Sequence, residues 1–328
     1  MSGSAIGGGQ EARITLPYDA TCPVVYDNDD HRDVYTDEYL YALASAGQID
    51  LRGIITSYPH DQDEYREFVA GRTWIVELAR QSGMTRLPDP IGGTNVRLAR
   101  PASGSIEDAA QLDCAGGRLI VEAARDASPE RPLVVVMGGP LTSAADAYLI
   151  DPSIADRVVV SALFGSFDGF YRWNAGLDRW AAQIVVERLR VVIFPEVANL
   201  DFAARVPKAR LPELPETPLR EWMIAKHHPS NDLPSERDAD GQPAISLVRP
   251  DYCRAARRVV LDPTTTGTRA ASHGGTASVA RPAGAPADTV PLYADDPYGR
   301  SLLVTDVDVD VATQAFFRAL SNPAAYGR

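Results

Sequence analysis

The stretch Pro23–Glu38, PVVYDNDDHRDVYTDE, decides the fold, because a short apolar run is followed directly by a dense group of acids. The run Val24–Tyr26 is typical of a buried strand, and the segment DEYLYALASAG that begins at Asp37 is typical of a helix. Six carboxylates fall within twelve residues, namely Asp27, Asp29, Asp30, Asp33, Asp37 and Glu38. In open α/β sheets, ligand sites form at the carboxyl ends of strands, so we expect a site here.

The density of negative charge favours a bound cation. Two like charges about 4 Å apart repel by roughly 1 kcal/mol in water and by several times more in a half-buried cleft. Carboxylate oxygens without a cysteine or histidine pattern are ligands for a hard ion such as Ca²⁺ or Mg²⁺ rather than zinc. The alternative interpretation is a solvated acidic loop.

Composition narrows the class of protein. The chain has 328 residues, 45% of them hydrophobic, and a net charge of −12 without any block of Lys and Arg, which argues against nucleic-acid binding. No apolar run approaches the roughly 18 residues that cross a bilayer, and the first residues lack the pattern of a secretory signal. The three cysteines are widely spaced, which predicts reduced thiols in a cytoplasmic protein.

Short β-branched strands alternate with amphipathic helices through the first two thirds of the chain. Strands are expected at Pro23–Asp27, Leu51–Ser57, Pro132–Gly138, Arg157–Leu163 and Arg190–Pro195, and helices at Glu64–Ser82, Gly116–Asp126 and Asp178–Leu189. This alternation predicts an α/β fold with a mainly parallel central sheet, helices on both faces and elaborated C-terminal loops. We expect residues 1–20 to be a flexible tail and residues 21–328 to form one domain.

The C-terminal third has a different pattern. The proline-rich stretch Asn199–Pro218 is expected to loop over the sheet, followed by a short helix at Pro218–His228. Thr264–Asp296 is expected to be a long hairpin or a mobile excursion. An alternating strand, LLVTDVDVDV, and a helix at Ala312–Leu320 complete the chain.

Several other groups in the sequence could join this site. The turn Gly138–Thr142 follows a strand and opens a helix, which allows close approach of a ligand to the backbone. Asn174 offers a donor and an acceptor to a sugar, whereas Asp178 is more simply a helix N-cap. His31 and His60 both lie at strand ends, and either Asp238 or Asp240 could bring a late carboxylate to the cation.

The order of these pieces resembles the inosine-uridine nucleoside hydrolase family. VVYDND followed by DEYLYALASAG is similar to the family's opening DxDxGxDD cluster, with DHRDVYT inserted. VVVMGGPLTS is similar to the family's TGPLTN strand and turn, RWNAGLD to its EFN…D element, and ADGQPAISLVRP to its late HDP-x-A element. The resemblance covers about residues 22–320 and implies a Ca²⁺-dependent hydrolase of the N-glycosidic bond of ribonucleosides, with Mg²⁺ as the alternative ion.

The resemblance also implies roles for individual residues. The metal ligands would be Asp29, Asp37, Glu38, Asp240 and the backbone carbonyl of Gly138. Asp29 would also be the general base that takes a proton from the attacking water. The substrate would be bound by Asp33, Asp37, Asn174, Arg172, His227 and His228, with Asp33 competing with Asp37 for the ribose hydroxyls.

Four positions depart from the family pattern. Glu38 replaces an Asp ligand, and Arg172 stands where a Glu usually contacts the 5′-hydroxyl, which suggests an anionic or absent 5′ group. Ala239 replaces the His that often protonates the leaving base, so His60, His227 or His228 would supply the acid, unless the leaving group needs none. His60 itself lies where the family often has Asn.

The expected protein is therefore an N-glycosyl hydrolase acting on a nucleoside or riboside, and the family is usually dimeric or tetrameric. One alternative substrate is a modified nucleoside, a 5′-nucleotide or another riboside. Another alternative is a protein that binds ribose or a nucleoside without turnover.

Overall fold

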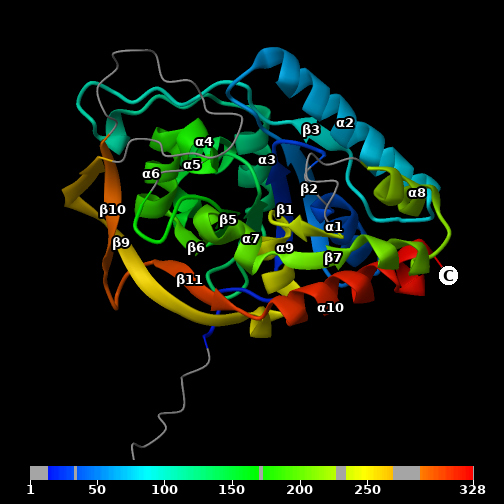
Figure 1. Cartoon of the computed structure of the whole chain (residues 1–328). Coiled ribbons are helices and arrows are strands. Elements are labelled where there is room, and N and C mark those ends of the chain that lie inside the picture. Colours follow the sequence, from blue (N-terminus) through cyan, green and yellow to red (C-terminus); the bar gives the residue numbers. More distant parts are fainter. Residues whose placement is uncertain (1–13, 33–34, 170–172, 227–233, 269–288, 328) are drawn as a thin grey trace, which may run out of the picture.

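A computed structural model describes residues 14–32, 35–169, 173–226, 234–268 and 289–327 of the chain (Figure 1). Its main feature is a nine-stranded sheet with the order β10-β9-β11-β6-β5-β4-β1-β2-β3 among the described residues. These strands are β1 (Pro23–Asn28), β2 (Asp50–Thr56), β3 (Pro90–Gly92), β4 (Leu133–Met137), β5 (Val158–Leu163), β6 (Arg190–Phe194), β9 (Cys253–Thr268), β10 (Thr289–Asp295) and β11 (Ser301–Val307). Figure 1 shows β9 and β10 at one end of the sheet and β2 and β3 at the other.

The sheet is mainly parallel, as the sequence predicts. Every neighbouring pair from β3 to β11 in the sheet order is parallel, whereas β9 pairs antiparallel with both β11 and β10. All five strands expected in the first two thirds form, and each end lies within one residue of the predicted position. The strand–helix alternation is therefore a sound guide to the fold class.

Helices cover both faces of the sheet. The helices are α1 (Thr36–Ser45), α2 (Gln62–Gln81), α3 (Ala115–Ala123), α4 (Thr142–Ile150), α5 (Trp173–Leu177), α6 (Arg179–Arg188), α7 (Asn199–Phe202), α8 (Pro218–Ala225), α9 (Gly241–Val248) and α10 (Val309–Leu320). Short 3₁₀ turns occur at Ile106–Asp108, Pro152–Asp156, Glu196–Ala198, Lys208–Glu213, Pro250–Tyr252 and Pro323–Tyr326.

Alternating side chains of the buried strands divide the core in two. Val24 and Tyr26 of β1 face a core shared with α1, α2, α8, α9 and α10, whereas Val25 faces a core shared with α3, α4 and α6. Both layers contain mostly Val, Ile, Leu and Ala on the sheet side, as a parallel sheet buried on both faces requires.

Side-chain caps explain where two predicted helices begin. Asp61 accepts hydrogen bonds from the backbone amides of Asp63 and Glu64 at the start of α2. Asp178 accepts one from the amide of Ala181 at the start of α6, which confirms the N-cap predicted for it.

The C-terminal third is more ordered than its composition suggests. The expectation of loops across Asn199–Pro218 was wrong, because α7, a strand β7 (Ala204–Pro207) and a 3₁₀ turn lie there. β7 pairs antiparallel with β8 (Ser235–Asp238) in a separate two-stranded sheet. β9 and β10 form the long hairpin that was one of the two expectations for residues 264–296, whose central part lies outside the described residues.

The start of the described chain packs onto the domain. Leu16 and Tyr18 are buried, although they belong to the stretch predicted as a tail, and the Tyr18 hydroxyl lies 2.8 Å from Ser161 Oγ and 2.7 Å from Ser246 Oγ. The packed domain therefore begins before residue 21. Among the helices of the described residues, none is both long enough and apolar enough to cross a membrane.

Candidate active site

The acids of the opening stretch lie where β1 ends and α1 begins. Asp27 is the penultimate residue of β1, Asp29 follows the strand, and Asp37 and Glu38 occupy the first turn of α1. Asp27, Asp37 and Glu38 are buried, so this cluster is not a solvated loop. Asp33, the other predicted ribose ligand of this stretch, lies outside the described residues.

Asp27 joins three elements of the fold. Ser57 Oγ, which follows β2, donates to Asp27 Oδ2 at 3.1 Å and lies 2.8 Å from Ser143 Oγ of α4. Burial raises the pKa of Asp27 to about 7, although the serine hydroxyls oppose this shift. Asp27 therefore supports the site by linking β1 to the end of β2 and to α4.

Asp37 forms an ion pair with Arg72 of α2, and both side chains are buried. Tyr26 Oη also donates to Asp37 Oδ1, at 2.8 Å, and Asn28 Nδ2 donates to Tyr26 Oη at 2.9 Å. The sequence interpretation missed Arg72. Its signal was its position on the apolar face of α2, four residues after Phe68 and three before Ile75.

Glu38 lies beside a second cation, Lys226, at the C-terminal end of α8. Lys226 Nζ is 3.7 Å from Glu38 Oε1 and 3.4 Å from the backbone carbonyl of His31, and both charged side chains are buried. Burial raises the pKa of Glu38 to about 7, whereas the charge of Lys226 lowers it. Lys226 was also missed, because nothing local in the sequence sets it apart from a surface lysine.

Two glycines allow the late carboxylate to approach the first strand. A Cβ at Gly138 would lie 2.6 Å from Asn28 Oδ1 and 2.9 Å from the Asp240 Cβ, and one at Gly139 would lie 2.8 Å from the backbone nitrogen of Asp29. Asp29, Gly138 and Asp240 therefore meet at the carboxyl edge of β1 and β4. Asn28 Nδ2 donates to Asp240 Oδ2 at 3.4 Å.

Asn174 reaches the same edge from α5. Its Nδ2 donates to the carbonyls of Gly138, at 2.5 Å, and Leu163, at 2.8 Å, and its backbone amide donates to Glu196 Oε1 at 3.0 Å. The amide nitrogen of the Asn174 side chain is thus committed to the backbone. The carbonyl of Gly138, a predicted metal ligand, accepts one of these bonds.

Of the histidines singled out from the sequence, His31 lies beside the acidic cluster, with its Nδ1 3.5 Å from Asp30 Oδ1. His60 is exposed, and its ring centroid lies 5.8 Å from that of Tyr58. His31 is buried against Gly71, and burial lowers the pKa of its imidazole. Arg172, His227 and His228 lie outside the described residues, so their roles stay predictions.

Most of the predicted metal ligands contact cations or amides, although Asp37 Oδ2 and both carboxylate oxygens of Glu38 accept no hydrogen bond from the described residues. Asp37 and Glu38 face Arg72 and Lys226, and the Gly138 carbonyl and Asp240 accept from amide nitrogens. Asp29 Oδ1 accepts from the backbone amide of Asp30 at 2.7 Å. Within the described part of the chain, no group of three or more His, Cys, Asp or Glu side chains is arranged to hold a metal ion.

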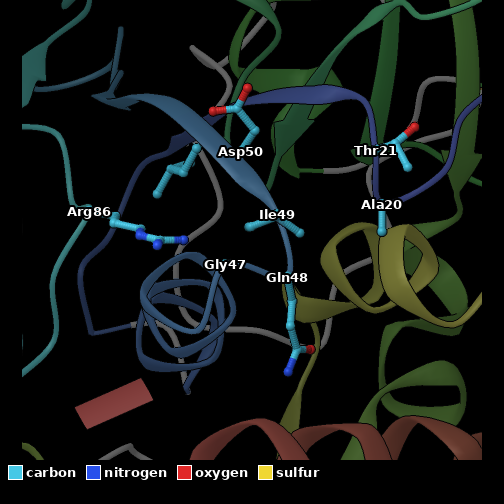
Figure 2. Close-up of a pocket in the computed structure, with 8 residues that line it drawn as sticks. Ala20, Thr21, Gly47, Gln48, Ile49, Asp50 and Arg86 are labelled. Atoms are coloured by element: carbon cyan, nitrogen blue, oxygen red, sulfur yellow. The ribbon is translucent and has the colours of Figure 1, made fainter. Parts of the chain in front are cut away.

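A pocket of about 460 Å³ lies at the amino ends of the parallel strands, beside the residues that lead into β1 and β2 (Figure 2). Ala20 and Thr21 line one side, and Gly47, Gln48, Ile49, Asp50, Leu51 and Arg86 line the rest. Its two charged residues, Asp50 and Arg86, have opposite signs, and Asp50 pairs with Arg52. The pocket lies away from the acidic cluster, because it borders the amino ends of the strands.

The whole fold matches solved structures of nucleoside hydrolases. The chain is similar to a plant nucleoside hydrolase, with a TM-score of 0.60 and 15% identity over 92% of this chain and 99% of that one. It is similar to an inosine-uridine preferring nucleoside hydrolase from Bacillus anthracis, with a TM-score of 0.59 and 14% identity over 92% of this chain and 99% of that one.

A third similar structure is the type III effector protein XopQ, complexed with adenosine diphosphate ribose, at a TM-score of 0.55 and 13% identity over 93% of this chain and 94% of that one. No protein-family model matches the chain. No curated protein matches it in sequence. At these identities the likeness establishes the fold, which confirms the fold expected from the resemblance.

Proposed function

We propose that this chain, which has the nucleoside-hydrolase fold, hydrolyses the N-glycosidic bond of a ribonucleoside or a related riboside. The observation that carries the proposal is the meeting of Asp29, Asp240 and the Gly138–Gly139 backbone at the carboxyl edge of β1 and β4. These are the positions that the family resemblance assigns to the reacting centre. They come from three distant parts of the sequence, so their meeting is a property of the fold.

The chemistry proposed for these residues is an attack of water on the anomeric carbon. Asp29 takes a proton from the water, the bond from the sugar to the base breaks, and the electron pair of that bond leaves with the base. The sugar develops positive charge in the transition state, and the carboxylates of Asp29 and Asp240 stabilise it. The acid that protonates the base is proposed to be His60 or a residue of the 227–228 pair.

A requirement for Ca²⁺ is a separate and more specific hypothesis than hydrolysis itself. The resemblance supports it, with Mg²⁺ as the alternative ion, whereas the contacts of the described residues oppose it. Glu38 and Asp37, for example, already face Lys226 and Arg72. The mechanism proposed here therefore contains no step through a metal, and the assay tests the ion directly.

The positions at which the sequence departs from the family pattern suggest the class of substrate. Arg172 replaces a residue that contacts a 5′-hydroxyl in the family, which favours a substrate with an anionic or absent 5′ group. A homo-dimer or homo-tetramer stays a prediction from the resemblance.

A second candidate function is binding of a riboside without turnover. It is favoured by Ala239 and Arg172, which replace the family's His and Glu, and by the exposure of His60, the proposed substitute for that His. The similar effector protein XopQ is complexed with adenosine diphosphate ribose, which makes a ribose-containing dinucleotide a ligand worth including in the assay.

The test is release of reducing sugar from a panel of nucleosides, 5′-nucleotides and adenosine diphosphate ribose, with added Ca²⁺ and with chelator. We expect release from the native chain and its loss in Asp29→Asn. Asp63→Asn is the control, because that carboxylate is 93% exposed and lies on the surface of α2. If the chain binds a riboside but releases no sugar from any member of the panel, the second candidate function is correct and hydrolysis is not.

A further inference from the structure

We infer that the buried side chains of Arg72 and Lys226 take the place of a divalent cation in this site, so that the chain keeps its acidic cluster together without metal. The inference rests on the proposed function only in treating this edge as the sugar site. It concerns how the charges are balanced, and it is tested by ion binding rather than by turnover.

Arg72 supplies the first positive charge from the side of α2. It is fully buried and forms the ion pair with Asp37. The same guanidinium lies 3.5 Å from the backbone carbonyl of Asp29 and 3.4 Å from Thr56 Oγ1. Because a guanidinium does not lose its proton in proteins, this charge is permanent.

Lys226 supplies the second positive charge from the side of α8. Its ammonium lies near Glu38, and the ring centroids of Tyr35 and Trp222 are 5.6 and 5.8 Å away. Aromatic faces attract a cation, and here they also exclude water from it. Lys226 is therefore held at Glu38 by charge and by packing.

The two side chains together carry the same charge of +2 as Ca²⁺ or Mg²⁺. They pair with Asp37 and Glu38, which are two of the acids that the resemblance assigns to the metal. A divalent ion entering beside them would meet the repulsion of two cations in a buried setting, where charges are weakly screened. It would find the charges of Asp37 and Glu38 already balanced by two cations, although Asp37 Oδ2 and both carboxylate oxygens of Glu38 accept no hydrogen bond from the described residues.

Two further predicted ligands, Gly138 and Asp240, already accept hydrogen bonds. The carbonyl of Gly138 accepts from Asn174, and Asp240 accepts from Asn28. An ion would share the Gly138 carbonyl and Asp240 with these amides, and it would have to draw Asp37 and Glu38 away from both cations. The disagreement with a calcium site therefore lies mainly in the two ion pairs.

The first measurement is calorimetric titration of the metal-stripped full chain with CaCl₂ and with MgCl₂, together with its melting temperature in each salt and in EDTA. We expect no stoichiometric heat and the same melting temperature in all three conditions. One Ca²⁺ bound per chain, with a higher melting temperature, would overturn the inference, because a ligand that binds the folded state raises its stability.

The second measurement uses the double variant Arg72→Met/Lys226→Met, which leaves the carboxylates without their partners. We expect it to bind Ca²⁺ with stoichiometric heat, which the native chain lacks, and to melt higher in CaCl₂ than in EDTA. Arg80→Met is the control on the same helix, because Arg80 pairs with an exposed carboxylate, Asp89. Its melting temperature should not depend on Ca²⁺.

The outcomes separate this inference from the proposed function. Ca²⁺ binding by the native chain overturns the inference and leaves hydrolysis untouched. An absence of sugar release overturns the function and leaves the ion-binding result standing. If the double variant does not fold in either salt, the titration of the native chain decides.

Discussion

Arg72 and Asp37 form an ion pair whose side chains are 0% and 2% exposed, between the middle of α2 and the first turn of α1. Removal of one partner from a buried pair leaves the other charge uncompensated, which typically costs about 3–5 kcal/mol. We therefore expect Arg72→Met alone to lower the free energy of unfolding by about that amount in urea titrations.

The matched double variant tests whether this cost comes from the lost partner. Arg72→Met/Asp37→Asn should be more stable than Arg72→Met, because no charge is left unpaired. Arg80→Met/Asp89→Asn removes an exposed pair whose arginine lies on the same helix, and it should change stability by about 1 kcal/mol or less. A double variant no more stable than the single one would show that the pair does not hold these helices.

Gly138 is required by close approach rather than by backbone conformation. A methyl group there would collide with Asn28 and Asp240, so we expect Gly138→Ala to cost about 1–3 kcal/mol and to abolish sugar release. The control is Gly176→Ala in α5, where a Cβ would meet nothing within 4 Å. That change should be neutral or stabilising by about 0.5–1 kcal/mol, since alanine is preferred in helices. Equal effects of the two changes would contradict the assignment.

Asp146 of α4 holds the turn before α3. Its two carboxylate oxygens accept from the backbone amides of Leu112, at 2.6 Å, Asp113, at 3.3 Å, and Cys114, at 2.8 Å. Asp113 has a positive φ of 53°, so the turn needs this support. Asp146→Ala should cost about 3 kcal/mol and speed amide exchange at residues 112–114. Unchanged protection of these amides would sink the idea.

Cys253 gives a pH dependence with a definite sign. Burial raises the pKa of its thiol to about 12. In the unfolded chain the thiol loses its proton near its ordinary pKa of about 8.5, so above that pH the unfolded state binds fewer protons. The stability is fully present below about pH 8.5 and falls as the pH rises, by up to about 1.4 kcal/mol per unit. Cys253→Ala should flatten this slope in urea titrations from pH 8 to 10.

The rate at which the cysteine thiols are alkylated tests whether they are accessible to solvent. Burial also raises the pKa of Cys114 to about 12, and alkylation requires the thiolate. We expect slow alkylation of the folded protein at pH 8 and labelling of all three cysteines in urea. Rapid labelling of the folded protein at Cys22 or Cys253, the two buried thiols, would contradict the packing described here.

The strand–helix pattern predicted the sheet well because β1, β4 and β5 are each buried along their whole length. A parallel strand covered on both faces is a nearly continuous apolar run, which stands out in a sequence. Asp29 and Gly138 follow predicted strand ends, whereas Asp240 was assigned only through the resemblance to the family's late element. The pattern failed at Asn199–Pro218, where prolines suggested loops although β7 pairs with β8 across a long sequence separation.

The cations were missed for a physical reason. Sequence periodicity shows which face of a helix is buried, and it does not show which partner lies opposite. Arg72 lies on the apolar face of α2, and the periodicity of that helix gives no sign of Asp37 opposite it. The role of Lys226 follows only from its contact with Glu38, which no local sequence pattern predicts.

The contact of Lys226 with the His31 carbonyl joins residues 195 positions apart in the sequence. During synthesis the acidic cluster therefore leaves the ribosome long before α8, one source of its balancing charge. Until then Glu38 has no ammonium group beside it, so its burial in α1 requires that it retain a proton. The ionised form of this buried carboxylate is thus coupled to the arrival of the C-terminal third, and a chain arrested before residue 226 would lack its counter-charge.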